Sequence, residues 1–389
     1  MIKQRAILDR IKPYYDSPEA IIITGMRRTG KTTLLNLIFS QIQSPNKIFL
    51  DLENPLNRKY FENPSYEKVK SSLEVLGVDF TRKPCIFLDE IQFVRTLPSI
   101  VKYLMDHFQA KFFLTGSASF YLKNLFSESL SGRKYIFELY PLTFREFLDF
   151  KDSALKIPEN AREIARPVFE SISPLYDEYL RFGGFPGVVL KTSAAEKAMA
   201  LDDIFTSYFQ WEVLQLGDFR KNAVIRDLIV LLAQRVGSKL DIQKISKELG
   251  ITRPTLYEYL AFLEGTFFIK LIRPYTRSRN SEIRKSPKVY LCDTGLANRL
   301  ANLNEGRIFE TSIFQNLRIK GEIGYYERKN GAEIDFLLDK THAFEAKMTP
   351  QQRDVNQLKR VAEELGMTSF SVVSRNLTDL ENTLYGFQI

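Results

Sequence analysis

Residues 25–32 read Gly-Met-Arg-Arg-Thr-Gly-Lys-Thr, which fits the phosphate-binding pattern G-x-x-x-x-G-K-[ST]. An apolar run at residues 20–24 precedes the motif and a helical stretch at residues 33–39 follows it, as the pattern requires. The two glycines let the backbone turn its amides toward phosphates, and the N-terminus of the helix adds a partial positive charge. The stretch therefore predicts a nucleotide-binding loop between a strand and a helix.

Four side chains supply the chemistry that such a loop needs. Lys31 is predicted to reach the β- and γ-phosphates, and the Thr32 hydroxyl is predicted to ligate Mg²⁺. A second apolar run, residues 85–89, ends in the carboxylate of Asp89, and Glu90 follows it. We expect Asp89 to hold Mg²⁺ through water and Glu90 to orient and polarise the attacking water. Together they predict binding of ATP with Mg²⁺ and its hydrolysis.

Two further residues have both a functional and a structural interpretation. Ser117 closes the apolar run 112–117 and is a candidate sensor of the γ-phosphate, or else it caps the end of a strand. Arg133 is a candidate catalytic arginine that neutralises transition-state charge from a neighbouring subunit, which would require a homo-oligomer. The alternative for Arg133 is an ordinary arginine on the surface.

The composition excludes several classes of protein. Of the 389 residues, 44% are hydrophobic and 26% are charged, which is typical of a globular chain with packed cores. Two cysteines do not make a disulfide framework, and two histidines argue against histidine-based zinc sites and a Ser-His-Asp triad. No run approaches the ~20 apolar residues of an integral membrane segment, and the charged N-terminus does not resemble a signal peptide. We therefore expect a cytoplasmic protein.

The order of predicted elements divides the chain into four segments. Residues 1–140 alternate strands with helices, which predicts an α/β fold with a mainly parallel sheet. Residues 141–222 read as helical, 223–300 as three short helices and strands, and 301–389 as helix, three strands, helix and strand. The strands expected in the first segment are residues 20–24, 47–52, 85–89, 111–115 and 134–139.

A series of motifs resembles a bacterial and archaeal group of ATPases in the AAA superfamily. Besides the loop and Leu88-Asp-Glu-Ile-Gln92, the motifs are Leu114-Thr-Gly-Ser-Ala-Ser119, Leu130-Ser-Gly-Arg133, Tyr140-Pro-Leu-Thr-Phe-Arg-Glu-Phe147 and Phe182-Gly-Gly-Phe-Pro186. The resemblance implies a P-loop NTPase core of five strands with a helical lid at residues 141–222, and it marks Arg28 as characteristic of the loop. The candidate nucleotide-binding residues are then Gly25, Arg28, Thr29, Gly30, Lys31, Thr32, Thr33 and Ser117.

Most of the net charge of +8 belongs to one middle segment, because residues 223–290 hold 13 Lys and Arg against 6 Asp and Glu. Residues 240–260 have the pattern of a helix-turn-helix, and a strand-like run at 267–274 follows it. We expect a winged-helix segment at 223–300 that binds DNA. Its candidate DNA-binding residues are Arg253, Thr255, Tyr257, Arg277 and Arg279. The alternative is a winged helix that contacts protein, or a solvated basic surface.

The last segment places acidic residues on neighbouring predicted strands. Residues two apart on a strand share a face, so Glu345 and Lys347 should project together beside Asp335. Glu310, on the preceding helix, would complete a site for a second divalent cation, Mg²⁺ or Mn²⁺. The element order and these residues resemble restriction-endonuclease-like folds with the PD-(D/E)XK motif, although no Pro-Asp pair precedes the motif. The alternative is a nuclease-like α+β domain that does not cleave.

Two functions from different classes remain open on these observations. The first is an ATPase that couples ATP hydrolysis to DNA binding or processing, with ATP and DNA as its partners. The second is a nucleotide-dependent regulatory switch that binds DNA or protein and carries an inactive nuclease-like domain. No sequence feature identifies a protein partner.

Overall fold

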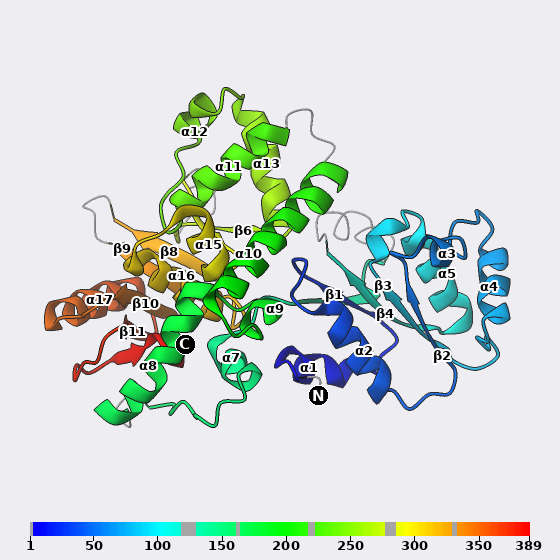
Figure 1. The fold of residues 1–389 in the computed structure, drawn as a ribbon, viewed down its shortest axis with the longest axis horizontal. Coiled ribbons are helices and arrows are strands. Elements are labelled where there is room, and N and C mark those ends of the chain that lie inside the picture. Colours follow the sequence, from blue (N-terminus) through cyan, green and yellow to red (C-terminus); the bar gives the residue numbers. More distant parts are fainter. Residues whose placement is uncertain (1–2, 118–129, 161–163, 217–221, 277–284, 329–332) are drawn as a thin grey trace. The chain divides into compact units, whose positions relative to one another are not determined.

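A computed structural model of the protein describes residues 3–117, 130–160, 164–216, 222–276, 285–328 and 333–389. The chain divides into two compact units (Figure 1). The first comprises Met1–Tyr140 with Gly265–Phe267, and the second comprises Pro141–Glu264 with Phe268–Ile389.

A five-stranded parallel sheet forms the centre of the first unit, as the sequence predicts. Its strands, in the spatial order β2-β3-β4-β1-β5, lie within one residue of the predicted bounds. They are β1 (Ala20–Thr24), β2 (Lys47–Asp51), β3 (Cys85–Asp89), β4 (Lys111–Gly116) and β5 (Lys134–Glu138). Because all four pairings are parallel, the carboxyl ends of the strands share one edge of the sheet.

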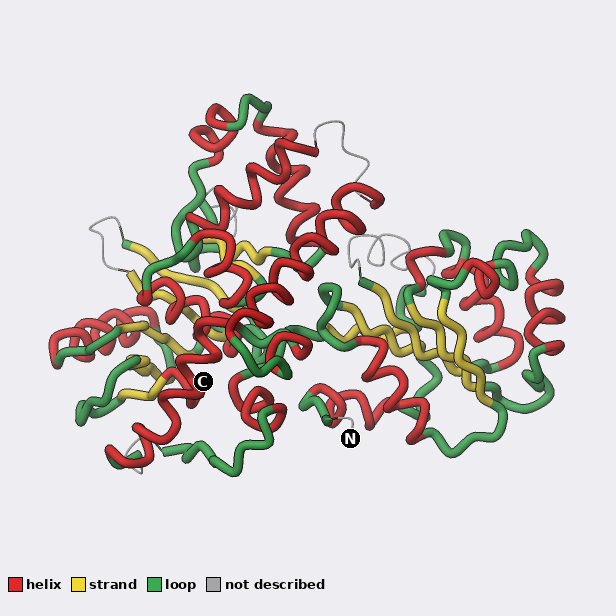
Figure 2. Tube along the Cα trace, in the orientation of Figure 1, coloured by secondary structure: helices red, strands yellow, loops and turns green. Residues whose placement is uncertain are grey.

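Helices cover both faces of this sheet (Figure 2). On β1 the alternate residues Ile21 and Ile23 pack with α1 (Ile7–Ile11) and α2 (Lys31–Gln41). Ala20 and Ile22 face the opposite core, which α4 and α5 complete. A strand buried on both faces needs a continuous apolar run rather than an alternating one, which explains the sequence of β1. The helices on the second side of the unit are α3 (Pro55–Arg58), α4 (Tyr66–Val75) and α5 (Leu97–Phe108).

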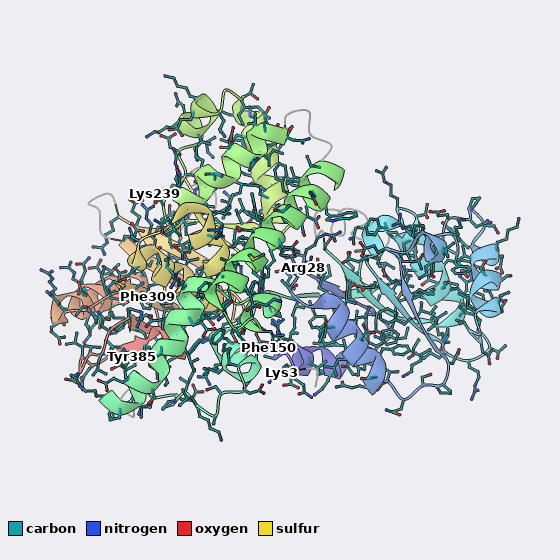
Figure 3. All side chains as sticks on the ribbon, viewed as in Figure 1. Lys3, Arg28, Phe150, Lys239, Phe309 and Tyr385 are labelled. Atoms are coloured by element: carbon teal, nitrogen blue, oxygen red, sulfur yellow. The ribbon has the colours of Figure 1, made fainter. Side chains whose placement is uncertain are left out.

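The second unit begins with helices and ends with a sheet. The regular elements described in its first part are helices: α7 (Phe144–Phe150), α8 (Arg166–Phe182), α9 (Pro186–Val189), α10 (Ala194–Tyr208) and a π-helical stretch at Phe209–Leu216. Three helices and an antiparallel strand pair follow: α11 (Asn222–Gln234), α12 (Ile242–Glu248), α13 (Arg253–Gly265), β6 (Ile269–Ile272) and β7 (Lys288–Leu291). An isolated antiparallel bridge joins Lys239, which Figure 3 labels, to Lys288.

A mixed five-stranded sheet of order β12-β11-β10-β9-β8 completes the second unit. The predicted helix, three strands, helix and strand are present as α16 (Glu305–Leu317), β8 (Ile323–Glu327), β9 (Glu333–Leu338), β10 (His342–Lys347), α17 (Gln352–Leu365) and β11 (Ser369–Ser374). The sequence analysis did not anticipate β12 (Thr383–Tyr385). Strands β8, β9 and β10 are antiparallel, whereas β11 runs parallel to β10 after the crossover through α17.

A buried carboxylate joins two loops of the second unit. Asp293 caps the N-terminus of α15 (Thr294–Ala301), where Leu296 N donates to its Oδ1 at 3.0 Å, and Gly184 N donates to its Oδ2 at 2.7 Å. A side chain at Gly183 would begin 1.9 Å from Asp293 Oδ1, which explains the glycine there. Burial raises the pKa of Asp293 to about 6, although the backbone hydrogen bonds oppose the shift. The Phe-Gly-Gly-Phe-Pro motif therefore has a structural role in placing this loop.

We expect Asp293→Ala to lower the free energy of unfolding by about 3 kcal/mol, because two buried amides lose a charged acceptor and a helix loses its cap. Asp241, which accepts from Lys244 N at 2.9 Å and caps α12 in an exposed position, provides a matched control. Asp241→Ala should cost only about 1 kcal/mol. Urea unfolding of both variants measures the difference. Equal losses would show that the buried contact with Gly184 adds nothing.

Candidate nucleotide-binding site and acidic cluster

The loop between β1 and α2 has the backbone that its glycines predict. Gly25 has φ 154°, and a side chain there would begin 2.2 Å from the carbonyl oxygen of Leu139. Gly30 has φ 95° and precedes the first residue of α2. Thr29 is buried, and its hydroxyl donates to the Met26 carbonyl oxygen at 2.9 Å. The loop is thus held in a conformation that places the N-terminus of α2 beside the end of β1.

The amine of Lys31 forms hydrogen bonds with the backbone of its own loop. Its Nζ donates to the carbonyl oxygens of Gly25 and Met26, both at 3.0 Å, and only 4% of the residue is exposed. Arg5, from the N-terminal segment, donates a hydrogen bond to the Thr29 carbonyl oxygen of the loop at 2.9 Å. A phosphate oxygen is a stronger partner for an ammonium group than a neutral carbonyl, because both groups are then charged.

The carboxylate of Asp89 lies beside the hydroxyls of Thr115 and Thr32. Asp89 ends β3 and Thr115 belongs to β4, between β3 and β1 in the sheet. Burial raises the pKa of Asp89, whereas hydrogen bonds from Thr115 and Thr32 lower it. The structure therefore brings together the two residues predicted to hold Mg²⁺. Oxygen ligands in this pairing suit a hard divalent cation.

Glu90 turns away from the strand in a left-handed conformation, with φ 53°. Its backbone N donates to Thr115 Oγ1 at 3.3 Å, and its carboxylate accepts a hydrogen bond from Gln92. Gln92 also donates to Ser117 Oγ at 3.1 Å, which links the predicted sensor to the predicted base. A non-glycine residue with positive φ is uncommon and is found disproportionately at functional sites. Gln92 ends the motif Leu88-Asp-Glu-Ile-Gln92, although no role was predicted for it.

Of the other predicted residues of the first unit, Arg28 and Thr33 lie at the loop, whereas Arg133 lies at the opposite end of the strands. Arg28 and Thr33 are exposed on the loop and on α2, with Arg28 at φ 66° (Figure 3). Arg133 precedes β5, where Ala20 pairs with Lys134, so it lies at the amino end of the parallel strands. It forms an ion pair with Asp106 at 3.3 Å. Since Lys31 follows the carboxyl end of β1, the sheet separates Arg133 from the loop of its own chain.

The predicted DNA-binding residues that the structure describes lie on α13. Arg253 and Tyr257 are exposed, and 58% of Tyr257 is accessible. Thr255 donates its backbone N to Thr252 Oγ1 at 3.3 Å, so this threonine takes part in the cap that begins the helix. Arg277 and Arg279 lie outside the described residues.

The four residues predicted for a nuclease-like site come together in the second unit. Asp335 Oδ2 accepts a hydrogen bond from Ala346 N at 2.9 Å, and Asp335 N donates to Glu345 Oε2 at 3.4 Å. Lys347 Nζ donates to Glu345 Oε1 at 2.8 Å. Glu310 projects from α16 and is close enough to Asp335 for its charge to raise the pKa of Glu310, an effect second to burial.

A fifth residue, Lys288 of β7, contacts two members of this group. Its Nζ forms ion pairs with Glu333, with Asp335 Oδ1 at 3.7 Å and with Glu310 Oε1 at 3.8 Å. Burial alone would lower the pKa of Lys288, but the three carboxylates outweigh burial and raise it. We call Lys288, Glu310, Glu333, Asp335 and Glu345 the acidic cluster. Neither Glu333 nor Lys288 was predicted as a site residue; Lys288 belongs to no motif and comes 22 positions before Glu310.

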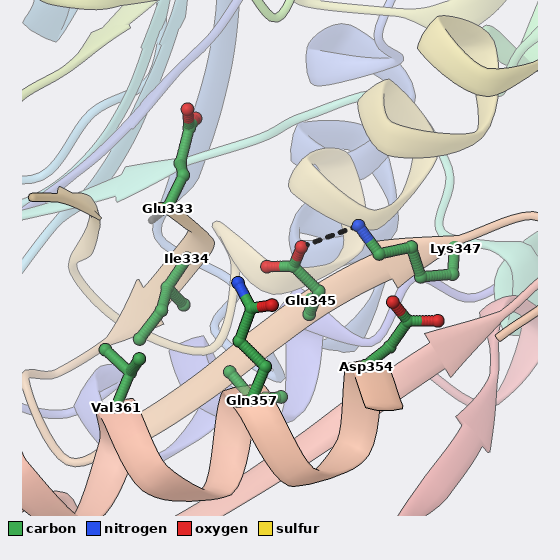
Figure 4. A pocket seen from close by; sticks show the side chains of 8 residues that line it. Glu333, Ile334, Glu345, Lys347, Asp354, Gln357 and Val361 are labelled. Carbon is green, nitrogen blue, oxygen red and sulfur yellow. Dashed lines mark hydrogen bonds and ion pairs between the residues drawn. The ribbon is translucent and has the colours of Figure 1, made fainter. Parts of the chain in front are cut away.

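A small pocket opens beside the acidic cluster (Figure 4). In the close-up, Glu345 and Lys347 point toward one another, while Asp354 and Gln357 approach from α17. The residues that line the pocket are Glu333, Ile334, Glu345, Lys347, Asp354, Gln357, Leu358 and Val361.

Within the described residues, no group of three or more His, Cys, Asp or Glu side chains has the arrangement of a metal site. No helix among those residues is both long and apolar enough to cross a membrane.

Two models of protein families match parts of the chain. Residues 17–148 match the model of an AAA domain, and residues 173–307 match a domain of unknown function. The chain therefore carries an AAA domain, which supports ATPase activity. An uncharacterized protein of Haemophilus influenzae is 27% identical over 87% of this chain and 84% of its own length. One from Methanocaldococcus jannaschii is 26% identical over 90% of this chain and 80% of its own.

Solved structures resemble the chain weakly. Cdc6p of Pyrobaculum aerophilum has a TM-score of 0.32 and 12% identity, over 80% of this chain and 96% of that one. A signal transduction ATPase with numerous domains from Pyrococcus horikoshii has a TM-score of 0.31 and 12% identity, over 82% of this chain and 45% of that one. Scores this low do not establish a shared fold over the whole chain.

Proposed function

We propose that the protein is a Mg²⁺-dependent ATPase that couples ATP hydrolysis to DNA binding. The observation that carries the proposal is the meeting of Lys31, Thr32, Asp89 and Glu90 at the carboxyl edge of one parallel sheet. Ligands of open α/β sheets bind at this edge. The match of residues 17–148 to an AAA domain supports the same activity.

Each of these side chains has a distinct task in the proposed reaction. When ATP binds, Lys31 exchanges its carbonyl partners for phosphate oxygens, and the amides at the start of α2 face the phosphate chain. Thr32 and Asp89 would hold Mg²⁺, which neutralises charge that develops on the phosphates. Glu90 positions the attacking water and accepts its proton. Gln92 fixes the Glu90 carboxylate and connects it to Ser117.

Arg133 takes part in this proposal only across a subunit boundary. It lies at the amino end of the strands, whereas the ATP site lies at their carboxyl end. Five residues of strand span about 17 Å at ~3.3 Å per residue, which is beyond the reach of an arginine side chain. A catalytic role for Arg133 therefore requires a homo-oligomer in which it approaches the ATP of a neighbour.

The proposed DNA contact rests on the elements between residues 222 and 291. Three helices followed by the antiparallel pair β6–β7 is the order of a winged helix, with the Lys239–Lys288 bridge as a third short strand contact. Arg253 and Tyr257 are exposed on α13, the helix that would enter the groove. The net charge of this segment favours a polyanion as the partner.

A hydrolysis assay on the full chain tests the proposal. Release of phosphate from ATP should require Mg²⁺ and stop on chelation with EDTA. At subsaturating ATP its rate should change about fivefold or more when duplex DNA is added, because coupling between two binding sites is typically worth about 5–150-fold in affinity. Lys31→Ala should abolish turnover by removing the phosphate-binding amine. Hydrolysis that persists in Lys31→Ala would contradict the assigned site, and a rate unaffected by DNA would contradict the coupling.

A further inference from the structure

The position of Lys288 in the acidic cluster differs from what a divalent cation would need. Mg²⁺ requires a near-octahedral set of oxygen ligands at about 2.0–2.1 Å around one point. Among the oxygens of Glu310, Glu333 and Asp335 the structure has an ammonium nitrogen instead, at 3.8 Å from Glu310 Oε1 and 3.7 Å from Asp335 Oδ1, with an ion pair to Glu333. A divalent ion placed among the same oxygens would repel this ammonium group at close range.

The backbone holds Lys288 in this place from both sides. Lys288 pairs with Ile272 in the β6–β7 sheet and with Lys239 in the isolated bridge. Its side chain is only 5% exposed. The Tyr325 ring lies beneath the ammonium group at 5.3 Å, which adds a cation–π contact. The lysine is therefore part of the packed interior rather than a mobile side chain.

Three of the carboxylates also have hydrogen-bond donors within the protein. Glu310 accepts a hydrogen bond from Tyr290, and Asp335 accepts one from Ala346 N at 2.9 Å. Glu345 accepts from Lys347 at 2.8 Å. Buried carboxylates persist when they are paired and hydrogen-bonded, and each of these has such partners. The residues of this cluster thus do not fit a second divalent cation.

We propose that Lys288 takes the place of a divalent cation in the acidic cluster and joins the β6–β7 pair to α16 and β9. The nuclease-like arrangement then has a structural role, because its ion pairs hold these elements together. The wild-type protein binds no divalent ion there. This inference does not depend on the proposed ATPase activity, because every residue that carries it belongs to the second unit.

Binding of Mn²⁺ to the nucleotide-free full-length protein, followed by electron paramagnetic resonance of the free ion, tests the inference. Lys288→Met removes the ammonium group and keeps the apolar stem, so this variant should bind about one more Mn²⁺ per chain than the wild type. The second change Asp335→Asn should abolish the gain. Lys239→Met is the matched control, because Lys239 pairs with Glu327 outside the cluster and its loss should add no ion.

Three results would overturn the inference. They are a Mn²⁺ ion that the wild type binds and Asp335→Asn releases, a folded Lys288→Met variant that gains no ion, and cleavage of plasmid DNA with Mn²⁺ that Asp335→Asn abolishes. If Lys288→Met does not fold, the comparison of wild type with Asp335→Asn decides alone. Equal Mn²⁺ binding by those two proteins supports the inference.

Discussion

Glu90→Gln should reduce ATP turnover by about 10²–10⁴-fold and leave ATP binding nearly unchanged. The amide keeps the size of the side chain and its contact with Gln92, but it does not accept a proton from the attacking water. The Glu90 carboxylate accepts a hydrogen bond from Gln92, so the amide should leave Thr32 and Asp89, the residues assigned to Mg²⁺, in place. The change thus separates the chemical step from binding.

Single-turnover hydrolysis and equilibrium binding of a fluorescent ATP analogue measure the two effects. Glu74→Gln is a suitable control, because it removes one carboxylate from the same unit and affects only an ion pair with Lys70 on α4. Lys31→Ala should show the opposite behaviour, with loss of binding itself. If Glu90→Gln retained more than about a tenth of wild-type turnover, another group would be the base, since general-base help is typically worth at least 10²-fold.

The sequence predicted the first unit well because its signals are local. A strand buried on both faces is a continuous apolar run, and the loop of residues 25–32 fixes where strand becomes helix. The observed strand order then places Asp89, at the end of β3, near Thr32. Arg133 is different, because its distance from the ATP site follows from the register of Ala20 with Lys134, which no local pattern encodes.

In the acidic cluster, too, some features follow from local sequence patterns and others depend on tertiary packing. Period-two alternation placed Glu345 and Lys347 on one face, and the structure agrees that Lys347 lies beside Glu345. Lys288 reaches the cluster from β7, whose sequence is an ordinary short strand. Its effect on the site depends on the tertiary packing of β7 against α16 and β9. Sequence patterns therefore identified Glu310, Asp335 and Glu345, but neither Glu333 nor the lysine that forms ion pairs with this cluster.

The affinity for duplex DNA should fall about 10³-fold between 50 and 200 mM salt if the basic segment neutralises roughly six phosphates. Each phosphate contact releases condensed counterions, so log K should decline with log salt at a slope near −5, from about 0.9 per phosphate. Fluorescence anisotropy of a labelled duplex at several salt concentrations gives the slope directly. A slope near zero would exclude a phosphate-bound mode and leave protein as the partner of this segment.

Substitutions on α13 test which residues contribute to the salt dependence of DNA binding. Arg253→Ala should weaken binding and make the slope less steep by about 1, because one phosphate contact is lost. Tyr257→Ala should weaken binding without changing the slope, since its exposed ring carries no charge. Lys102→Ala removes the same charge from an exposed position on α5, far along the chain from the basic segment, and should change neither quantity. If Arg253→Ala and Lys102→Ala behaved alike, general surface charge rather than α13 would account for the attraction to DNA.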